Sequence, residues 1–363
     1  MSADADKAGK AGKERTRKKR GGDAQRRIDA KYVGRARSLF NMIRGLAKIY
    51  DDRAELAAMN RGKRGRPYVY THSLVAAISS IRDSLGLDFR GCEGLLPEGK
   101  GPEYTTIFRR VNAQDASIRE SLSGVECSGV AISLVPDGTG LTPATRSEYV
   151  RVVHRLRRGF LRLTIMINKE TLEIVAFRLT DDSVGEPTVF EDLLHDALAN
   201  LGVDPDRRRA EVLAQKNSPR KTYRGITLMA DGGYDSGEIF SACRKLGIAT
   251  NIRVRVDANA RADGVDRAGS EAVLDQLGGG PGATAAGLAA LDDSEREANR
   301  RKWKERVRYG TRWLVEIVIS AFKRTYGDAV AARKMENIRQ EIRLKICTYN
   351  RMLRIGREAA MKA

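Results

Sequence analysis

The feature that most restricts the fold is a change in hydrophobic spacing near residue 128. Upstream of it, apolar residues recur at helical intervals. Downstream come short apolar runs typical of strands: 130–137, 160–168 and 171–179, the last two separated by only two residues. Helix and strand patterns alternate after this hairpin. We therefore predict an α/β fold for residues 126–330, with a mixed sheet flanked by helices.

The later elements of this region follow from turn signals and apolar spacing. We expect helices at 187–202 and 236–247, strands at 225–231 and 248–256, and a long apolar helix from about 309. Residues 257–300 are rich in Gly, Ala and charged side chains, which predicts a mobile insertion. Residues 331–363 are predicted to form a closing helical segment.

Two aspartates follow apolar runs of the predicted sheet. Asp137 lies in PDGTG and Asp231 lies in ADGGYDS, and each is followed directly by glycine. Active sites of open α/β sheets lie at the carboxyl ends of the strands. We expect both carboxylates to emerge at strand ends and to converge if the two strands are neighbours. Taken singly, an Asp-Gly pair after a strand is more often an ordinary turn.

The stretch YGTRWLVEIVISAFK (309–323) is apolar except for a narrow polar stripe. Tyr309, Arg312, Glu316 and Lys323 are spaced by three, four and seven residues, so they share one face of an α-helix. A helix that is apolar around the rest of its circumference is mostly buried, and its polar stripe should then face a cavity or a ligand. The alternative is an Arg312–Glu316 pair on a solvated face.

Asp137, Asp231 and Glu316 would repel one another unless a cation lay between them. Oxygen ligands without sulfur or imidazole favour Mg²⁺ or Mn²⁺. Two such ions about 3.5–4 Å apart could hold a scissile phosphate. Arg312 and Lys323 could bind DNA phosphates and balance the acids, and Tyr309 could hydrogen-bond or stack nearby.

The formal net charge of +19 indicates a polyanionic partner, most often nucleic acid, with an anionic membrane surface as the competitor. No apolar run approaches the ~20 residues that a spanning helix needs, and residues 1–20 lack the apolar core of a secretory signal. The four cysteines are widely spaced and the three histidines show no zinc spacing, so we expect reduced thiols, no structural zinc and a cytoplasmic protein.

The N-terminal part is predicted to be a disordered basic tail at 1–28, followed by a helical DNA-binding domain at 29–125. Helices at 71–86, 88–96 and 103–111 would form a helix-turn-helix-like unit whose last helix carries Arg109 and Arg110. Many basic three-helix bundles never contact DNA, however.

Other basic segments have two readings each. The sequence RGRP around Arg64 and Arg66 is similar to the core that AT-hooks insert into the minor groove, or it is a basic linker broken by Gly and Pro. The basic segments 146–162 and 215–224 flank the predicted acids and could follow DNA, although taken alone each is more simply explained as a solvated surface.

These motifs resemble those of the DDE transposases of bacterial and archaeal insertion sequences. The spacing Tyr-x2-Arg-x3-Glu-x6-Lys is matched in full from Tyr309 to Lys323, and Asp137 and Asp231 match the two aspartates. The segments Arg324 to Gly327 and Tyr349–Asn350 are also similar. The resemblance covers roughly residues 65–355.

The resemblance implies a ribonuclease H-like catalytic domain that uses two Mg²⁺ or Mn²⁺ ions to cut the ends of a transposon. The freed 3′-hydroxyl would then be joined to target DNA, with the protein working as a homodimer in a synaptic complex. Arg162, at a position where relatives more often carry lysine, is a candidate phosphate contact. The Gly-rich insertion lacks the alternation of an all-β insertion, so no hairpin-stabilising role is carried over to it.

Two alternatives remain open on the sequence. One is a standalone ribonuclease H-like endonuclease that cuts without joining. The other is a transposase-derived DNA-binding or regulatory protein without catalysis, although three converging carboxylates would have no purpose in a pure binder.

Overall fold

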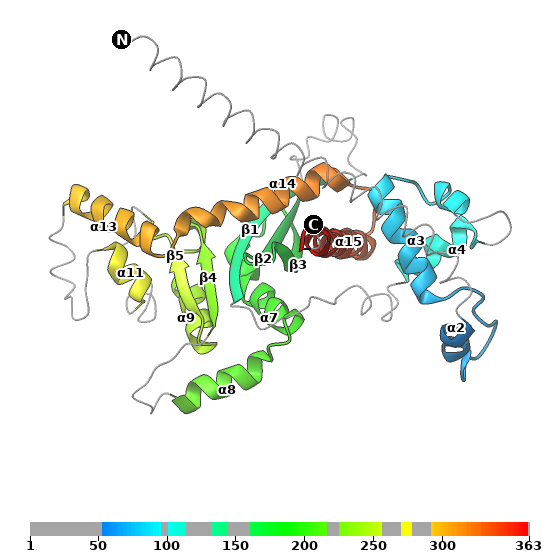
Figure 1. The fold of residues 1–363 in the computed structure, drawn as a ribbon, viewed down its shortest axis with the longest axis horizontal. Helices are drawn as coiled ribbons and strands as arrows, with labels where there is room; N and C mark the ends of the chain where they lie inside the picture. The colour runs from blue at the N-terminus through cyan, green and yellow to red at the C-terminus, as the bar shows by residue number, and fades with distance from the viewer. Residues whose placement is uncertain are drawn as a thin grey trace, which may run out of the picture. The chain divides into compact units, whose positions relative to one another are not determined.

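The computed structural model describes residues 53–95, 101–113, 132–143, 160–215, 225–255, 270–277 and 292–361. These residues fall into two compact units (Figure 1). The first takes in the described residues up to Ala113 and those from Arg351 onward, and the second reaches Asn350. The tail predicted at 1–28, the first part of the helical domain, the basic segments 146–159 and 216–224, and parts of 257–300 lie outside the described residues.

The second unit is built on a six-stranded mixed sheet with the strand order β3-β2-β1-β4-β5, and β6 pairs with the far end of β1. Antiparallel pairing joins β1 to β2 and β2 to β3, while parallel pairing joins β1 to β4 and β4 to β5. The strands are β1 (Ile132–Pro143), β2 (Leu161–Asn168), β3 (Glu173–Asp181), β4 (Ile226–Ala230), β5 (Ala249–Ile252) and β6 (Ala329–Val330). The mixed α/β fold predicted from the sequence is confirmed.

Helices lie on both sides of this sheet (Figure 1). The helices α7 (Phe190–Asn200) and α9 (Gly237–Lys245) bury apolar side chains against one face, in a cluster that includes Phe190, Leu194, Phe240, Met166 and Leu228. Successive side chains of a strand point to opposite faces. Leu163 and Ile165 of β2 are therefore buried on the other face, along which α14 (Leu314–Tyr326) runs beside β1.

The stretch 257–300, predicted to be a mobile insertion, is helical where the structure describes it. Helix α11 (Glu271–Gln276) is attached to the end of β5, because the buried Gln276 side chain accepts from the Val254 N–H and donates to the Ile252 carbonyl. Helix α13 (Asp293–Arg306) begins with a capping box between Asp292 and Glu295. The high Gly and Ala content of the whole stretch concealed these local start signals. A further helix, α8 (Pro205–Gln215), follows α7.

The last helix, α15 (Met335–Met361), closes the outer edge of the sheet. β3 is an edge strand, and the side chain of Asn350 meets both backbone groups of Ile174 there. Its Oδ1 accepts from the Ile174 N–H and its Nδ2 donates to the Ile174 carbonyl, both at 2.9 Å. Asn350 thus takes the place of a neighbouring strand at this position.

The first unit contains α2 (Arg53–Asn60), α3 (His72–Leu85), the 3-10 helix η1 (Gly91–Leu95) and α4 (Tyr104–Asn112). Thr71 caps the start of α3, and Gly86 ends it with φ of 66°, as its sequence predicts. The middle helix predicted at 88–96 is shorter than predicted and is a 3-10 helix. Two glycines disfavour an α-helix, and the Asp88 carboxylate accepts from the Gly91 N–H, leaving a single 3-10 turn.

Within the part of the chain that the structure describes, no helix combines the length and the apolar content that crossing a bilayer requires.

Candidate functional site

Asp137 lies inside β1 rather than at its end, which corrects the prediction. β1 pairs with β2 along most of its length, and Asp137 lies opposite Ile165. Its parallel pairing with β4 ends at Leu134. On the β4 side the strand is therefore unpaired at Asp137, and the carboxylate still lies where the parallel part of the sheet ends. The Gly138 N–H donates to Asp137 Oδ1 at 2.9 Å and orients it.

Asp231 follows the last residue of β4 directly, as predicted. It caps the short 3-10 helix η3 (Gly232–Tyr234), and its Oδ1 accepts from the Gly233 N–H at 2.8 Å. The second glycine after the aspartate thus has a defined use, since the Gly233 amide fixes the carboxylate. Asp231 is close enough to Asp137 for its negative charge to raise the pKa of that carboxyl.

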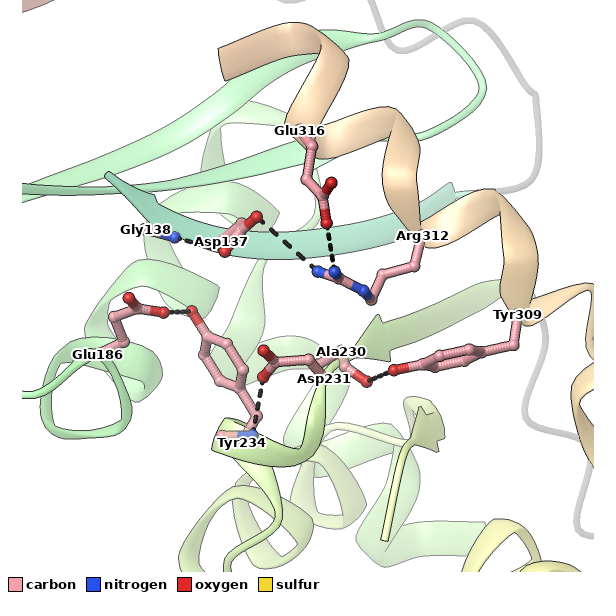
Figure 2. Close-up of polar contacts among 10 residues, drawn as sticks. Asp137, Gly138, Glu186, Ala230, Asp231, Tyr234, Tyr309, Arg312 and Glu316 are labelled. Carbon is pink, nitrogen blue, oxygen red and sulfur yellow. Dashed lines mark hydrogen bonds and ion pairs between the residues drawn. The ribbon is translucent and has the colours of Figure 1, made fainter. Parts of the chain in front are cut away.

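The polar stripe is divided between two elements, which corrects the prediction of one continuous α-helix. Tyr309 and Arg312 belong to the 3-10 helix η4 (Tyr309–Trp313), and Glu316 and Lys323 belong to α14. The helix is also less buried than predicted, because only one face, that of Val315, Val318 and Phe322, is buried in the described structure. Figure 2 shows Arg312 and Glu316 beside Asp137, whereas Tyr309 points to the Ala230 carbonyl.

Arg312 joins two of the predicted catalytic acids. Its Nη2 donates to Glu316 Oε1, and its Nη1 lies 3.8 Å from Asp137 Oδ2. The Arg312 and Asp137 side chains are about one-fifth exposed, whereas that of Glu316 is 55% exposed. The guanidinium therefore lies between a shielded and a solvated carboxylate, where it offsets the charge of both (Figure 2).

A pocket of about 600 Å³ opens over these groups. Its walls carry Asp137 and Glu316 together with two cationic side chains, Lys323 and Arg324. The structure thus brings three of the predicted residues, Asp137, Glu316 and Lys323, to one pocket from β1 and α14. Carboxylates and cations that face one cavity can hold a phosphodiester and the cations that accompany it.

Carboxylate oxygens are the donors that Mg²⁺ and Mn²⁺ prefer, so the residues fit a divalent cation in kind. Burial raises the pKa of Asp137 to about 6, and the charges of Glu186 and Asp231 add to this effect, while the Gly138 N–H and Arg312 oppose it. A bound cation would favour the charged form of this half-buried carboxylate. The positions of the side chains give a different result: among the described residues, no three His, Cys, Asp or Glu side chains lie close enough together to share a metal ion.

Tyr309 has a partner different from the predicted DNA contact. Its hydroxyl donates at 2.9 Å to the carbonyl of Ala230, the residue just before Asp231 (Figure 2). The ring lies against Trp303, with the centroids 4.9 Å apart, and burial raises the pKa of the phenol to about 12. Tyr309 therefore supports the backbone that carries Asp231.

Arg162 does not join the face that carries Asp137. It lies opposite Gly140 in the β1–β2 ladder, and Asp137 lies opposite Ile165, three residues along β2. An odd separation along a strand places the two side chains on opposite faces. The Arg162 guanidinium lies 6.0 Å from the ring centroid of Phe160.

The arginines predicted to contact DNA from the first unit differ in their surroundings. Arg110 is used internally, since its guanidinium donates to the Tyr70 carbonyl, lies 2.6 Å from His72 Nδ1 and stacks on the Tyr68 ring. By contrast, the side chains of Arg64, Arg66 and Arg109 are exposed.

One acidic residue near the site is absent from the sequence-based prediction. Glu186 begins the 3-10 helix η2 (Glu186–Val189), which leads from β3 into α7, and its Oε2 accepts from the Tyr234 hydroxyl at 2.8 Å. A signal was available in its position, because it is an acid in the turn that enters a helix directly after the hairpin. The sequence GEPT by itself indicates only a helix start.

The raised pKa of Asp137 predicts a specific dependence of stability on pH. A folded-state pKa above the unfolded value favours protonation of the folded protein, so stability is lost as pH rises through about 4 to 6. Without divalent ions, Asp137→Asn should be more stable than the wild type above pH 6, by on the order of 2 kcal/mol. Urea unfolding in a chelating buffer from pH 4.5 to 8 measures this gap.

Asp292→Asn is the control of opposite sign. Hydrogen bonding from the Glu295 N–H lowers the pKa of Asp292, so its contribution is present at neutral pH and is lost as pH falls. A gap between Asp137→Asn and the wild type that stays constant from pH 4.5 to 8 would contradict a raised pKa at Asp137.

The sheet and the pocket together define a class of protein. It is an α/β protein whose sheet carries Asp137 in the wall of a pocket that a later helix lines with Glu316, Lys323 and Arg324. A family model described as Transposase DDE domain matches residues 147–351, which is more than half of the chain. The chain belongs to this family of transposases. Asp231 and Glu316 lie within the match and Asp137 lies just upstream of it; no curated protein and no solved structure matched the chain.

Proposed function

We propose that this protein is a DNA transposase in which Asp137, Asp231 and Glu316 support metal-dependent cutting and joining of DNA. The observation that carries the proposal is the shared pocket, where Asp137 and Glu316 face Lys323 and Arg324. These side chains come from positions far apart in the sequence, and the pocket lies in the unit that carries the family match. The mixed sheet is consistent with a ribonuclease H-like fold.

The three carboxylates would hold Mg²⁺ or Mn²⁺, Asp137 and Asp231 from the sheet and Glu316 from α14. When bound, two such ions would activate a water or a 3′-hydroxyl and stabilise the leaving oxygen of a phosphodiester. A phosphate of the substrate would compete with Glu316 for the Arg312 guanidinium, because both are anions that accept its N–H groups. DNA binding would thereby release Glu316 from its ion pair.

The cationic side chains would hold the DNA backbone. Lys323 and Arg324 lie in the wall of the pocket, where a phosphate would balance their charge. Tyr309 would not contact DNA. Its hydroxyl would hold the Ala230 carbonyl and so fix the backbone just before Asp231. Arg162, on the other face of the sheet, could contact DNA only outside this pocket.

The first unit would bind double-stranded DNA in a helix-turn-helix-like manner. α4 buries Ile107 and Val111 and presents Arg109 on its outer side, as a helix that enters the major groove would. Arg64 and Arg66, in the loop between α2 and α3, would contact the minor groove. The DNA bound would be the terminal repeats of the transposon and the target. The protein would act as a homodimer, in the cytoplasm, on nucleoid DNA.

A strand-transfer assay tests the proposal. The protein is incubated with Mg²⁺, a DNA fragment that carries the ends flanking its gene, and a supercoiled target plasmid. A transposase yields plasmid joined covalently to the fragment's 3′ ends, whereas a standalone endonuclease yields cut DNA without joints. Retention of DNA in a gel shift with neither product would favour the binding protein without catalysis and would contradict the proposal.

A further inference from the structure

A buried contact links η2, the 3-10 helix that follows β3, to η3, the 3-10 helix that follows β4. Tyr234 is 1% exposed, and its ring packs against Phe190 at the start of α7, with the centroids 5.9 Å apart. Its hydroxyl donates to Glu186 Oε2 at 2.8 Å. The Tyr234 N–H also donates to the Asp231 carbonyl at 3.2 Å. Glu186 is therefore held by the same turn that positions Asp231.

The other oxygen of Glu186 reaches the backbone beside Asp137. A Cβ atom placed on Gly138 would lie 2.1 Å from Glu186 Oε1, so the glycine leaves the space that the carboxylate occupies. The N–H of this same Gly138 donates to Asp137 Oδ1. Any larger residue at 138 would displace Glu186, the β1 backbone at Asp137 or both. The close approach explains why a glycine follows this aspartate.

The negative charge of Glu186 costs free energy, and packing alone does not require a charge at this position. Its carboxylate lies against the Gly138 backbone, whose N–H holds Asp137 Oδ1, so two carboxylates lie near each other. Like charges at this range destabilise a protein unless a cation offsets them. A glutamine could accept the Tyr234 hydrogen bond with nearly the same shape and without that repulsion. The negative charge itself is therefore the feature that calls for a role.

We propose that Glu186, held by Tyr234, is a positioning residue of the acidic site that strengthens the binding of a divalent cation at Asp137 and Asp231. The inference rests on the proposed function. Glu186 would act through the field of its carboxylate and through the Gly138 backbone that orients Asp137. Residues that orient and polarise metal ligands typically contribute about 10- to 100-fold to metal affinity.

The test measures binding of Mn²⁺ to the full-length protein by titration calorimetry. Glu186→Gln keeps the acceptor for Tyr234 and removes the charge, and it should weaken Mn²⁺ binding by about tenfold or more. Tyr234→Phe keeps the charge but frees the carboxylate, and it should weaken binding by a smaller factor. Glu191→Gln, which changes an exposed acid in the first turn of α7, is the matched control and should bind like the wild type.

A second readout separates positioning from a structural role. In a DNA-cleavage assay, Glu186→Gln should raise the Mn²⁺ concentration for half-maximal rate, with most of the rate recovered at saturating Mn²⁺. A purely structural Glu186 would instead lower the urea midpoint and leave Mn²⁺ affinity at the Glu191→Gln value, which would overturn the inference. Wild-type protein that binds no Mn²⁺ would overturn the proposed function and, with it, this inference.

Discussion

Replacement of Asp137, Asp231 or Glu316 by the corresponding amide is expected to lower the rate of DNA cleavage by about 10³-fold or more. A metal ion supplies several kcal/mol of transition-state stabilisation, and each 1.4 kcal/mol changes a rate about tenfold. The amides keep the local structure, because an asparagine side-chain oxygen would still accept from the backbone N–H groups that Asp137 and Asp231 now engage. A single-turnover cleavage assay in Mg²⁺ measures the loss.

Binding separates this loss from a loss of folding or of DNA contact. Each of the three variants should retain DNA affinity in a gel shift, since the main phosphate contacts come from cationic side chains. Asp206→Asn, in the exposed first turn of α8, is the matched control and should cleave at the wild-type rate. If all three variants bound DNA and none of them lost cleavage, the metal-site hypothesis would be wrong.

Removal of the Asn350 side chain is expected to produce a large loss of stability. Asn350→Ala leaves the N–H and the carbonyl of Ile174 without their partner at a buried edge of β3. An unsatisfied buried backbone group costs about 1–3 kcal/mol, so the free energy of unfolding should fall by about 2–4 kcal/mol. Urea denaturation followed by circular dichroism measures this change.

Asn200→Ala gives the matched comparison for Asn350→Ala. The Asn200 side chain donates one hydrogen bond, at 2.8 Å, to the carbonyl of Val175 on the same strand. Its removal should cost about 1 kcal/mol, since one partner of a partly buried bond is lost. Equal losses for the two variants would show that Asn350 does not replace a neighbouring strand.

Much of the second unit could be predicted because its signals are local. The short apolar runs and the two-residue break between 168 and 171 each act within a few residues. The convergence of Asp137 with Glu316 and Lys323 was also predictable, whereas Asp231, predicted to join them, is not among the residues that line their pocket. Strand neighbours and helix spacing are enough to bring the first three side chains to one pocket.

What the sequence could not reveal depends on contacts between distant segments. The position of Asp137 inside β1 follows from how far β2 extends past the end of β4, which no local pattern records. Arg110 looks like a DNA contact in a basic helix, yet Tyr70 and His72 use its guanidinium. Glu186 is an ordinary helix-start acid until Tyr234 and Gly138 are placed beside it.

The hydrogen bond from Tyr309 to Ala230 has a mechanical consequence. It ties the segment that begins α14 to the last residue of β4, across 79 residues of sequence. If η4 shifts while α14 adjusts to a bound duplex, either that bond breaks or the strand terminus is pulled along. The position of Asp231 therefore depends on the position of η4, the segment that leads to Glu316. The Tyr309 hydroxyl couples the two.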